Sequence, residues 1–401
     1  MTLDYRSTVF LPKTEFPMRA GLAKREPEIL ARWLEMDLYA LQRAQAKGCE
    51  KFVLHDGPPY ANGHLHMGHA LNKILKDVIN RAQQMLGKDA NYVPGWDCHG
   101  LPIEWKVEEE YRARGQDKDA VDKVEFRREC RDFAARWIEI QIEEFQRLGV
   151  IGDWKRPYKT MSFDAEAQIV RELGKFLMNG ALYAGSRPVL WSVPERTALA
   201  DAEVEYHEHK STTVWARFPV ISSPRPELDG ASVVIWTTTP WTLPGNRAIA
   251  YAEDEDYIVL EVKAVGENSK AVPGERVLIA QHLRDQVMAD AKIEAAETLA
   301  TLSGQDLAGT VTAHPLRGQG YDGDVPLLPG DFVTTDAGTG FVHIAPGHGT
   351  DDYNLGRKHG LEIPHTVGPD GAFLPHVPLF AGCLVLTPDG KDGDANVAVI
   401  K

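Results

Sequence analysis

The chain has 401 residues, of which 43% are hydrophobic and 25% are charged, and its formal net charge is −14. This length allows two or three globular domains, and the composition is that of a protein with an ordinary buried core. The negative charge argues against a protein that coats DNA or membranes through a uniformly basic surface, although it leaves local basic patches open.

Residues 1–50 carry the pattern of a helical segment. Apolar residues recur at the spacing of one helix face from Ile29 to Leu38, just after the sequence Glu26-Pro27-Glu28. We expect this segment to pack against the domain that follows it.

Residues 51–185 alternate between strand and helix signals. Short strands are predicted at 51–54 and 91–93, and a loop rich in Gly and Pro follows each of them. The order strand, loop, helix, strand predicts the α/β class, with a doubly wound, Rossmann-like parallel sheet. We expect only the first half of such a sheet in this chain.

Three helices are predicted within this region. The first ends at Gly87, and two longer ones lie near 120–148 and 164–179. The apolar stripe of the first helix consists of Leu71, Ile74, Leu75, Val78, Ile79, Ala82, Met85 and Leu86. A basic run around Arg128 is either a nucleic-acid patch or, as we favour, a solvated helix face.

Residues 186–401 are expected to form a mainly β domain inserted into the fold. Short β-rich runs at 233–236, 257–262 and 332–335 alternate with turns rich in Gly and Pro, and a last strand is predicted at 397–400.

The cysteines and the apolar runs indicate the cellular compartment. Four cysteines lie far apart without a C-x-x-C pair, whereas disulfide scaffolds and zinc ribbons need closer pairs. Unpaired thiols fit a reducing cytoplasm. No basic segment followed by an apolar run opens the chain, and no apolar run approaches the roughly 18 residues of a membrane span. We therefore expect a cytoplasmic protein without a signal peptide.

The first candidate site is His66-Met67-Gly68-His69, at the predicted mouth of a helix. A helix N-terminus offers free N–H groups, Gly68 admits a nucleotide close to the backbone, and imidazoles can donate to a phosphate that gathers charge. This chemistry suits nucleotidyl transfer from ATP. The pattern also occurs by chance, and with His64 the two histidines could instead bind a metal, although no acidic cluster lies nearby.

Longer stretches around this site resemble a known family. HDGPPYANG before the two histidines and PGWDCHGLPIE after them, together with Phe16–Trp33, are similar to the class I isoleucyl-tRNA synthetases. The similarity extends over essentially the whole chain. It identifies His66–His69 as the HIGH signature of that family, which implies that this segment binds ATP with Mg²⁺ and that His66 and His69 are catalytic.

An amino-acid pocket needs an anion for the ammonium group and an apolar cavity for the side chain. Asp97 fits the first role, because a buried ammonium group without a carboxylate is very costly. The resemblance implies that Asp97 binds the amino group and that Gly57 and Pro58 line the pocket. Trp96 is either a wall of this pocket or, as we favour, part of the core, and His99 is equally open.

A second site follows from a limit of the first. Valine lacks one methylene of isoleucine, a difference worth only about 1–3 kcal/mol, a magnitude known from this enzyme class itself. Two further segments resemble the hydrolytic editing domain of the isoleucyl, valyl and leucyl enzymes. They supply Thr237, Thr238, Thr239, Thr242, Asn246, His343 and Asp352.

The resemblance implies roles for this second set. Threonine hydroxyls position the ester and a water molecule, Asp352 pairs with the α-ammonium group, and His343 contacts the terminal ribose and narrows the pocket. By itself the threonine run is typical of an ordinary β-strand. The editing interpretation therefore depends on both segments occurring together.

The chain departs from the family in two places. Trp191-Ser192-Val193-Pro194 replaces a W-C-x-x-C element, so we expect no zinc and predict no metal site. A lysine loop of the KMSKS type does not occur before Lys401. We therefore expect a fragment that lacks half of the ATP site and forms little adenylate alone.

These features together predict an isoleucine–tRNA ligase that activates L-isoleucine with ATP, transfers it to tRNA(Ile) and hydrolyses valyl-tRNA(Ile). We expect a monomer with these three substrates as partners and no membrane contact. Two alternatives stay open. One is a valine–tRNA ligase-like enzyme, and the other is a tRNA-binding paralogue without ligase activity.

Overall fold

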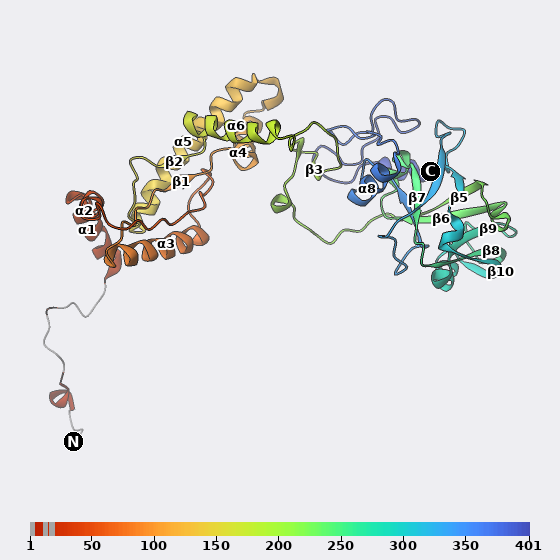
Figure 1. Cartoon of the computed structure of the whole chain (residues 1–401), viewed down its shortest axis with the longest axis horizontal. Coiled ribbons are helices and arrows are strands. Elements are labelled where there is room, and N and C mark those ends of the chain that lie inside the picture. Colours follow the sequence, from red (N-terminus) through yellow and green to blue (C-terminus); the bar gives the residue numbers. More distant parts are fainter. Residues whose placement is uncertain (1–4, 11–14, 16–20) are drawn as a thin grey trace. The chain divides into compact units, whose positions relative to one another are not determined.

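The computed structural model describes residues 5–10, 15 and 21–401 of the chain. The chain divides into two compact units, Met1–Tyr183 and Ala184–Lys401 (Figure 1). Their boundary lies two residues before the one expected from the sequence. The first five residues of the stretch 16–33 lie outside the described part.

The first unit consists mainly of helices. They are α1 (Leu22–Glu35), α2 (Leu38–Gln45), α3 (Met67–Met85), α4 (Leu101–Ala113), α5 (Lys123–Arg147) and α6 (Phe163–Met178), with 3-10 turns at η1 (Tyr5–Thr8) and η2 (Lys118–Ala120). The pattern from Ile29 to Leu38 therefore spans two helices, and Pro27 lies inside α1 rather than at its start. The three helices predicted downstream are confirmed as α3, α5 and α6.

The strands of the first unit are short but parallel. β1 (Gly95–Trp96) pairs with β2 (Tyr158–Lys159), and single parallel bridges join Lys51 to Asp89 and Tyr60 to Asp97. The α/β class is thereby confirmed. The strands predicted at 51–54 and 91–93 are wrong.

Two local features explain where pairing occurs. Val53 is 81% exposed, so the run 51–54 has no layer packed against one of its faces and keeps only one bridge. Pairing then starts after Pro94, a residue that has no N–H to donate. It starts at Gly95, where a Cβ would lie 3.1 Å from the ring of Tyr158, so the strands approach closely because a side chain is missing.

Helix α3 turns its apolar stripe outward. Leu71, Leu75 and Val78 are 63%, 55% and 58% exposed, whereas the buried side chains of this helix are Lys73 and Asn80. The stripe exists as predicted, but the core of the unit lies elsewhere. That core gathers around Trp96, Ile103 and the inner face of α5.

A nine-stranded sheet dominates the second unit and confirms its mainly β class. Its order is β10-β8-β9-β6-β5-β11-β12-β7-β13, in which β9–β6 and β12–β7 are parallel neighbours and the others antiparallel. The strands are β5 (Val214–Ser222), β6 (Ala231–Thr237), β7 (Ala248–Tyr251), β8 (Asp256–Val265), β9 (Arg276–Ala280), β10 (Ile293–Ser303), β11 (Val311–Ala313), β12 (Asp324–Pro329) and β13 (Phe341–Ile344). A separate hairpin pairs β3 (Trp191–Ser192) with β4 (Thr197–Ala198).

Short helices complete this unit. They are α7 (Arg284–Asp290), α8 (Thr350–His359) and α9 (Ala395–Ile400), with 3-10 turns η3 (Asp201–Glu203), η4 (Pro226–Leu228), η5 (Pro240–Gly245), η6 (Gln281–Leu283) and η7 (Gly304–Leu307). Across the residues that the structure describes, no helix is both long and apolar enough to cross a bilayer.

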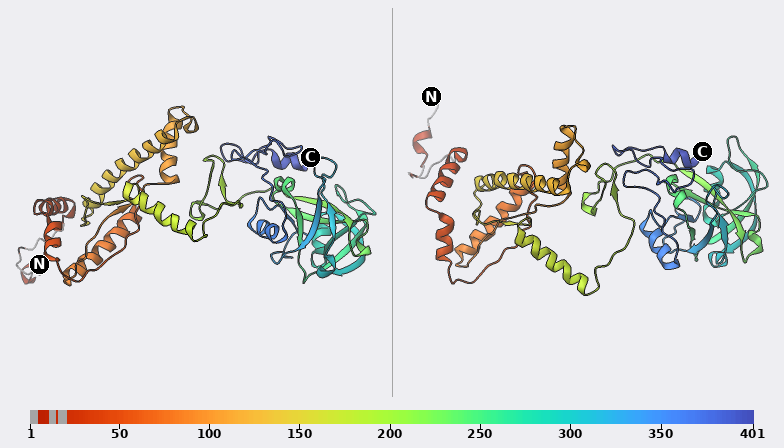
Figure 2. Two further views of the ribbon diagram at one scale, coloured as in Figure 1. Left: turned by 45° about the horizontal axis from the view of Figure 1, so that its top comes forward. Right: turned by 90° about the horizontal axis from the view of Figure 1, so that it is seen from above.

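The strands of the second unit, coloured green to light blue, lie together in one body (Figure 2). The residues just before β13 reach across to β8 and β9. Tyr257 Oη donates to the carbonyl of Gly340 over 2.9 Å, and the amide of Ala280 donates to the carbonyl of Thr339 over 2.8 Å. Gly340 has φ of +79°, and a Cβ at this position would collide with Ala280. Glycine is therefore what allows this approach.

Two predicted strands of this unit are wrong. Residues 332–335 follow a turn, because Pro329-Gly330-Asp331 redirects the chain after β12. Residues 397–400 lie in α9, where Ala395 and Val399 pack in one cluster while Val397 is half exposed. This is helical i, i+4 spacing, which outweighs the β-branched composition. The runs at 233–236 and 257–262 are confirmed in β6 and β8.

Candidate functional site

The start of α3 holds the two histidines predicted for phosphate chemistry. His66 is the N-cap, and its Nδ1 accepts a hydrogen bond from the amide of Gly68 over 3.0 Å. The Nδ1 atom of His69 accepts from the amide of His66 over 3.3 Å, and the two ring centroids are 3.8 Å apart. A Cβ on Gly68 would lie 2.9 Å from the His66 ring, so only glycine leaves that ring in place.

These contacts fix which ring nitrogens can act on a ligand. Each accepted bond needs a lone pair on Nδ1, so the proton of each neutral ring sits on Nε2. Burial, followed by the neighbouring His66 and Lys73, lowers the pKa of His69 and favours this neutral form. The pair therefore offers two N–H donors beside the positive end of a helix dipole, an arrangement suited to a phosphate.

The loop before this helix is joined to the segment that carries Asp97. The amide of Asp97 donates to the carbonyl of Pro59 over 2.8 Å, and the amide of Ala61 donates to the carbonyl of Asp97 over 2.9 Å. A Cβ on Gly95 would lie 3.4 Å from Cβ of Pro58, so the proposed pocket residue Pro58 packs directly on β1. Among the described residues, the carboxylate of Asp97 has no hydrogen-bond or ion-pair partner, while Gly57 next to Pro58 is exposed.

Asp56 anchors the loop before α3 to the helix itself and to Tyr92. Its carboxylate accepts from Lys73 and Lys76 of α3, and from Tyr92 Oη over 2.7 Å. Burial alone would raise the pKa of Asp56, but the hydrogen bonds from Lys73, Lys76 and Tyr92 outweigh it and lower that pKa. The inward position of Lys73 on α3 is explained by this cluster.

The side chains that the sequence left ambiguous have definite places. Trp96 is fully buried, in agreement with the favoured core assignment, and His99 Nε2 lies 3.1 Å from Glu166 Oε1. The basic run is partly neutralised, because Arg128 pairs with Glu125 and Arg131 pairs with Glu166.

The three histidines considered as metal ligands do not converge. His64 Nδ1 faces Glu144, whereas His66 and His69 direct Nδ1 at backbone amides. Among the described residues, no group of three or more His, Cys, Asp or Glu side chains could hold a metal ion.

The second unit brings six of the seven residues of the other predicted set into one cavity of about 380 Å³. The end of β6 and the turn η5 supply one wall, and β13 with the first turn of α8 supplies the other. Predicted residues that line the cavity are Thr237, Thr238, Thr239, Thr242, His343 and Asp352. Segments about a hundred positions apart in sequence therefore meet at one site.

His343 is held on both ring nitrogens. Nε2 lies 2.8 Å from Thr242 Oγ1, and Nδ1 lies 3.4 Å from Asn246 Nδ2. Because the amide of Asn246 is a donor, Nδ1 accepts and Nε2 carries the proton. Thr242 in turn donates to the carbonyl of Thr239 over 2.8 Å. Burial, followed by His314 and His348, lowers the pKa of His343 to about 4, so the ring is neutral at pH 7.

Asp352 lies at the first turn of α8, where the helix dipole favours an anion. Its Oδ1 accepts from the amide of Ala345 over 2.7 Å, and its Oδ2 lies where a Cβ on Gly349 would collide with it. Burial raises the pKa of Asp352 despite the Ala345 contact. A cation brought into the cavity would relieve this desolvation.

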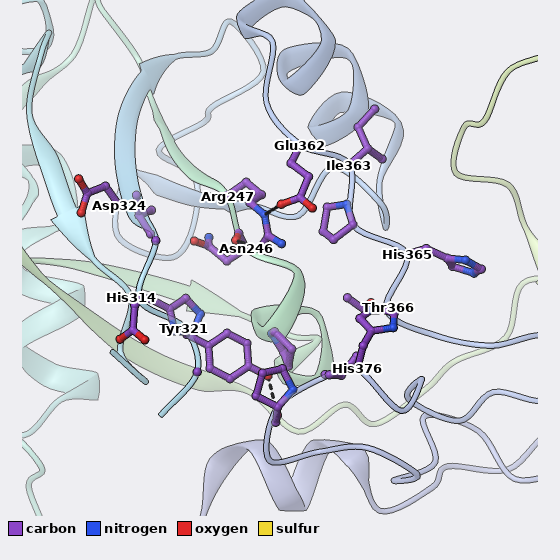
Figure 3. Close-up of a pocket in the computed structure, with 18 residues that line it drawn as sticks. Asn246, Arg247, His314, Tyr321, Asp324, Glu362, Ile363, His365, Thr366 and His376 are labelled. Atoms are coloured by element: carbon purple, nitrogen blue, oxygen red, sulfur yellow. Dashed lines mark hydrogen bonds and ion pairs between the residues drawn. The ribbon is translucent and has the colours of Figure 1, made fainter. Parts of the chain in front are cut away.

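Asn246 lines a neighbouring cavity of about 590 Å³ instead of the first one (Figure 3). Arg247 lies beside it and pairs with Glu362 over 3.1 Å. His348 of the first cavity lies 2.6 Å, Nε2 to Oγ1, from Thr366 of the second, so these residues separate the two. The structure thus connects Asn246 to the first cavity only through His343.

Several residues of these sites were missed by the sequence interpretation. Asp56 lies in a loop and Lys73 lies outside the apolar stripe of α3, so hydrophobic periodicity did not predict that either residue is buried. Gln141 and Glu144 of α5 contact the loop before His66. One signal existed for Gln141, since the buried positions Ala134, Ile138 and Phe145 place it on the inner helix face.

A family model described as class I tRNA synthetases (I, L, M and V) matches residues 28–346. Isoleucine–tRNA ligases are among the curated relatives. That of Gluconobacter oxydans is 57% identical over 94% of this chain and 40% of its own length. That of Caulobacter vibrioides is 56% identical over 99% of this chain and 42% of its own length.

The chain thus spans about two fifths of these relatives. Among solved structures, a leucyl-tRNA synthetase in a ternary complex, from Agrobacterium radiobacter, is 19% identical. The match covers 86% of this chain and 44% of the leucyl-tRNA synthetase chain, with a TM-score of 0.39.

Proposed function

Because this chain belongs to the class I tRNA synthetases of the I, L, M and V group, we propose that it carries the HIGH half of an isoleucine-activating site and a complete editing site. The isoleucine–tRNA ligases that share 52–57% of its residues support isoleucine as the amino acid. The proposed substrates are L-isoleucine, ATP accompanied by Mg²⁺, and tRNA(Ile). The proposed protein is cytoplasmic and monomeric, without structural zinc in this segment.

The activation step follows from the groups of the first unit. The carboxylate of isoleucine attacks the α-phosphorus of ATP, an oxygen–phosphorus bond forms, and pyrophosphate leaves. The Nε2–H donors of His66 and His69 stabilise the negative charge that develops on the phosphate oxygens. Asp97 holds the α-ammonium group, while Gly57 and Pro58 bound the side-chain pocket. A hydroxyl of the terminal adenosine of tRNA then attacks the acyl carbon, an ester bond forms, and AMP leaves.

The editing step is supported most directly by the convergence of the predicted residues in one cavity. Asp352 pairs with the ammonium group of a misattached valine, and the hydroxyls of Thr238 and Thr239 orient the ester and a water molecule. His343 is neutral and bound on both nitrogens, so it shapes the wall and orients Thr242. We propose that any contact of His343 with the terminal ribose runs through its ring edge.

Two alternatives differ in what they require. A valine–tRNA ligase would use the same groups and differ in pocket size by one methylene. A tRNA-binding paralogue would have no need of imidazoles that keep Nε2–H free for a ligand or of a partly buried Asp352 carboxylate beside the threonine hydroxyls. These groups favour the enzyme.

The test is hydrolysis of valyl-tRNA(Ile) and of isoleucyl-tRNA(Ile) by the purified chain. We expect selective loss of the valyl ester, and no such loss with the Asp352→Ala variant. Selective hydrolysis of threonyl-tRNA(Val) would instead indicate valine specificity. Binding of tRNA without hydrolysis by a folded chain would favour the paralogue.

A further inference from the structure

Helix α5 carries a buried glutamine that joins both loops of the first site. Gln141 is 0% exposed, and its Oε1 accepts from Trp96 Nε1 over 2.8 Å. Its Nε2 donates to the carbonyls of Gly63 and Tyr60 over 2.8 Å and 3.2 Å. One side chain thus connects the loop before His66 with the strand before Asp97.

Glu144 extends this connection by one helical turn. Its Oε2 accepts from the amide of Leu65 over 2.9 Å, and its Oε1 lies 2.5 Å from His64 Nδ1. Glu144 therefore contacts the two residues that directly precede His66. Residues three apart on a helix share a face, so Gln141 and Glu144 present one polar edge to the loop.

Helix α5, which carries both side chains, is packed into the core of the first unit. α5 is 25 residues long, and Phe133, Ala134, Ile138 and Phe145 are buried in the core of the unit. The loop 55–65, by contrast, has no helix or strand of its own beyond single bridges. A loop of this kind keeps one shape only if its backbone groups find partners elsewhere.

We propose that Gln141 and Glu144 are positioning residues of the amino-acid activation site. They hold residues 60–65 against residues 95–98, and so fix the donors of His66 and His69 relative to the carboxylate of Asp97. This inference rests on the proposed function. Neither side chain touches a substrate, and each acts through the loop that it anchors.

Substitutions of the two residues should have different effects on kcat and on the KM values. Glu144 contacts only the side of the loop that leads to His66, so Glu144→Ala should raise the KM for ATP and lower kcat about tenfold, with the KM for isoleucine unchanged. Gln141 contacts both segments, so Gln141→Met should lower kcat about a hundredfold and raise both KM values. Small displacements of reacting groups produce losses of this size.

The experiment measures isoleucine-dependent pyrophosphate exchange in the gene product at its full natural length, together with amide hydrogen exchange of residues 60–70. Glu144→Gln keeps an acceptor for the Leu65 amide and should recover most of the activity that Glu144→Ala loses. The adjacent, exposed Glu143→Gln is the matched control. In Glu144→Ala we expect the Leu65 amide to exchange at least tenfold faster.

The two readouts separate this inference from the function on which it rests. Absence of isoleucine-dependent exchange in the unaltered protein would overturn the proposed function. Unchanged hydrogen exchange of residues 60–70 in folded Glu144→Ala would overturn the positioning role, whatever the activity. Equal changes of both KM values in Glu144→Ala would overturn it as well. If Gln141→Met does not fold, the Glu144 variants carry the test.

Discussion

The two units support their candidate sites in opposite ways. In the first, the imidazoles proposed to bind phosphate lie at an open helix start, and side chains of α3 and α5 hold the loop before them. In the second, the polar groups line a cavity and bind one another, as His343 binds Thr242. The open site therefore depends on contacts made outside it, whereas the enclosed site contains much of its own support.

Separate cores should make the units respond independently to core truncation. Ile258 of β8 and Ile138 of α5 are buried in different clusters. Ile258→Ala should lower the free energy of unfolding of the second unit by about 2–5 kcal/mol, as cavity-forming substitutions do. Ile138→Ala should do the same to the first unit only. Calorimetry of both variants that showed one common transition, shifted equally, would contradict this independence.

Removing one phosphate donor should have the next largest effect. His66→Asn keeps an acceptor for the Gly68 amide but loses the Nε2–H donor, whereas His66→Ala loses both. In the gene product at its full natural length, we expect both variants to lower isoleucine-dependent pyrophosphate exchange about 10²–10³-fold, the usual loss for one such donor. Only His66→Ala should also lower the melting temperature. Near-normal exchange in His66→Asn would mean that capping is the role of this residue.

Asp352→Asn tests the enclosed site with little change of shape. Loss of one charged hydrogen bond to the substrate ammonium group costs about 1.5–3 kcal/mol, so deacylation should slow roughly 10- to 150-fold. Pyrophosphate exchange should not change. The neighbouring, exposed Asp351→Asn serves as the control. Equal slowing in both variants would argue for a general charge effect.

A smaller effect is expected from pH. Burial lowers the pKa of His343 and of His348 to about 4, below the unfolded value of 6.5. Between these values the unfolded chain binds more protons, so stability is present at pH 7 and is lost as the pH falls. From pH 7 to 6 the second unit should lose on the order of 1 kcal/mol.

Thermal unfolding at several pH values checks this prediction. His343→Gln should remove about half of the decrease in the free energy of unfolding between pH 7 and 6. Burial raises the pKa of Asp352, which acts in the opposite sense. Stability that rises on acidification from pH 7 to 6 would show that this carboxyl group dominates.

The sequence was informative where short motifs carry their own chemistry. The His66–His69 segment was placed correctly at a helix start, and the threonine run and His343 converge on one cavity. Sequence patterns gave wrong predictions where tertiary contacts determine the secondary structure or the burial of a side chain. Val397 and its neighbours are β-branched yet helical, and Lys73 is drawn inward by Asp56, which no periodicity encodes. Gln141 was missed because two of its partners are backbone carbonyls, which every residue has, and the third is a tryptophan 45 positions away in sequence.

One contact of the second unit bears on how such a protein arises. Trp191 of the β3–β4 hairpin donates from Nε1 to the carbonyl of Pro369 over 3.0 Å, and a Cβ on Gly390 would lie 3.4 Å from Pro194. Early and late segments of this unit therefore lie side by side. Residues between adjoining segments can be exchanged or lengthened as one block without parting the segments themselves. The second unit can accordingly change in evolution as one block, with a history separate from that of the first unit.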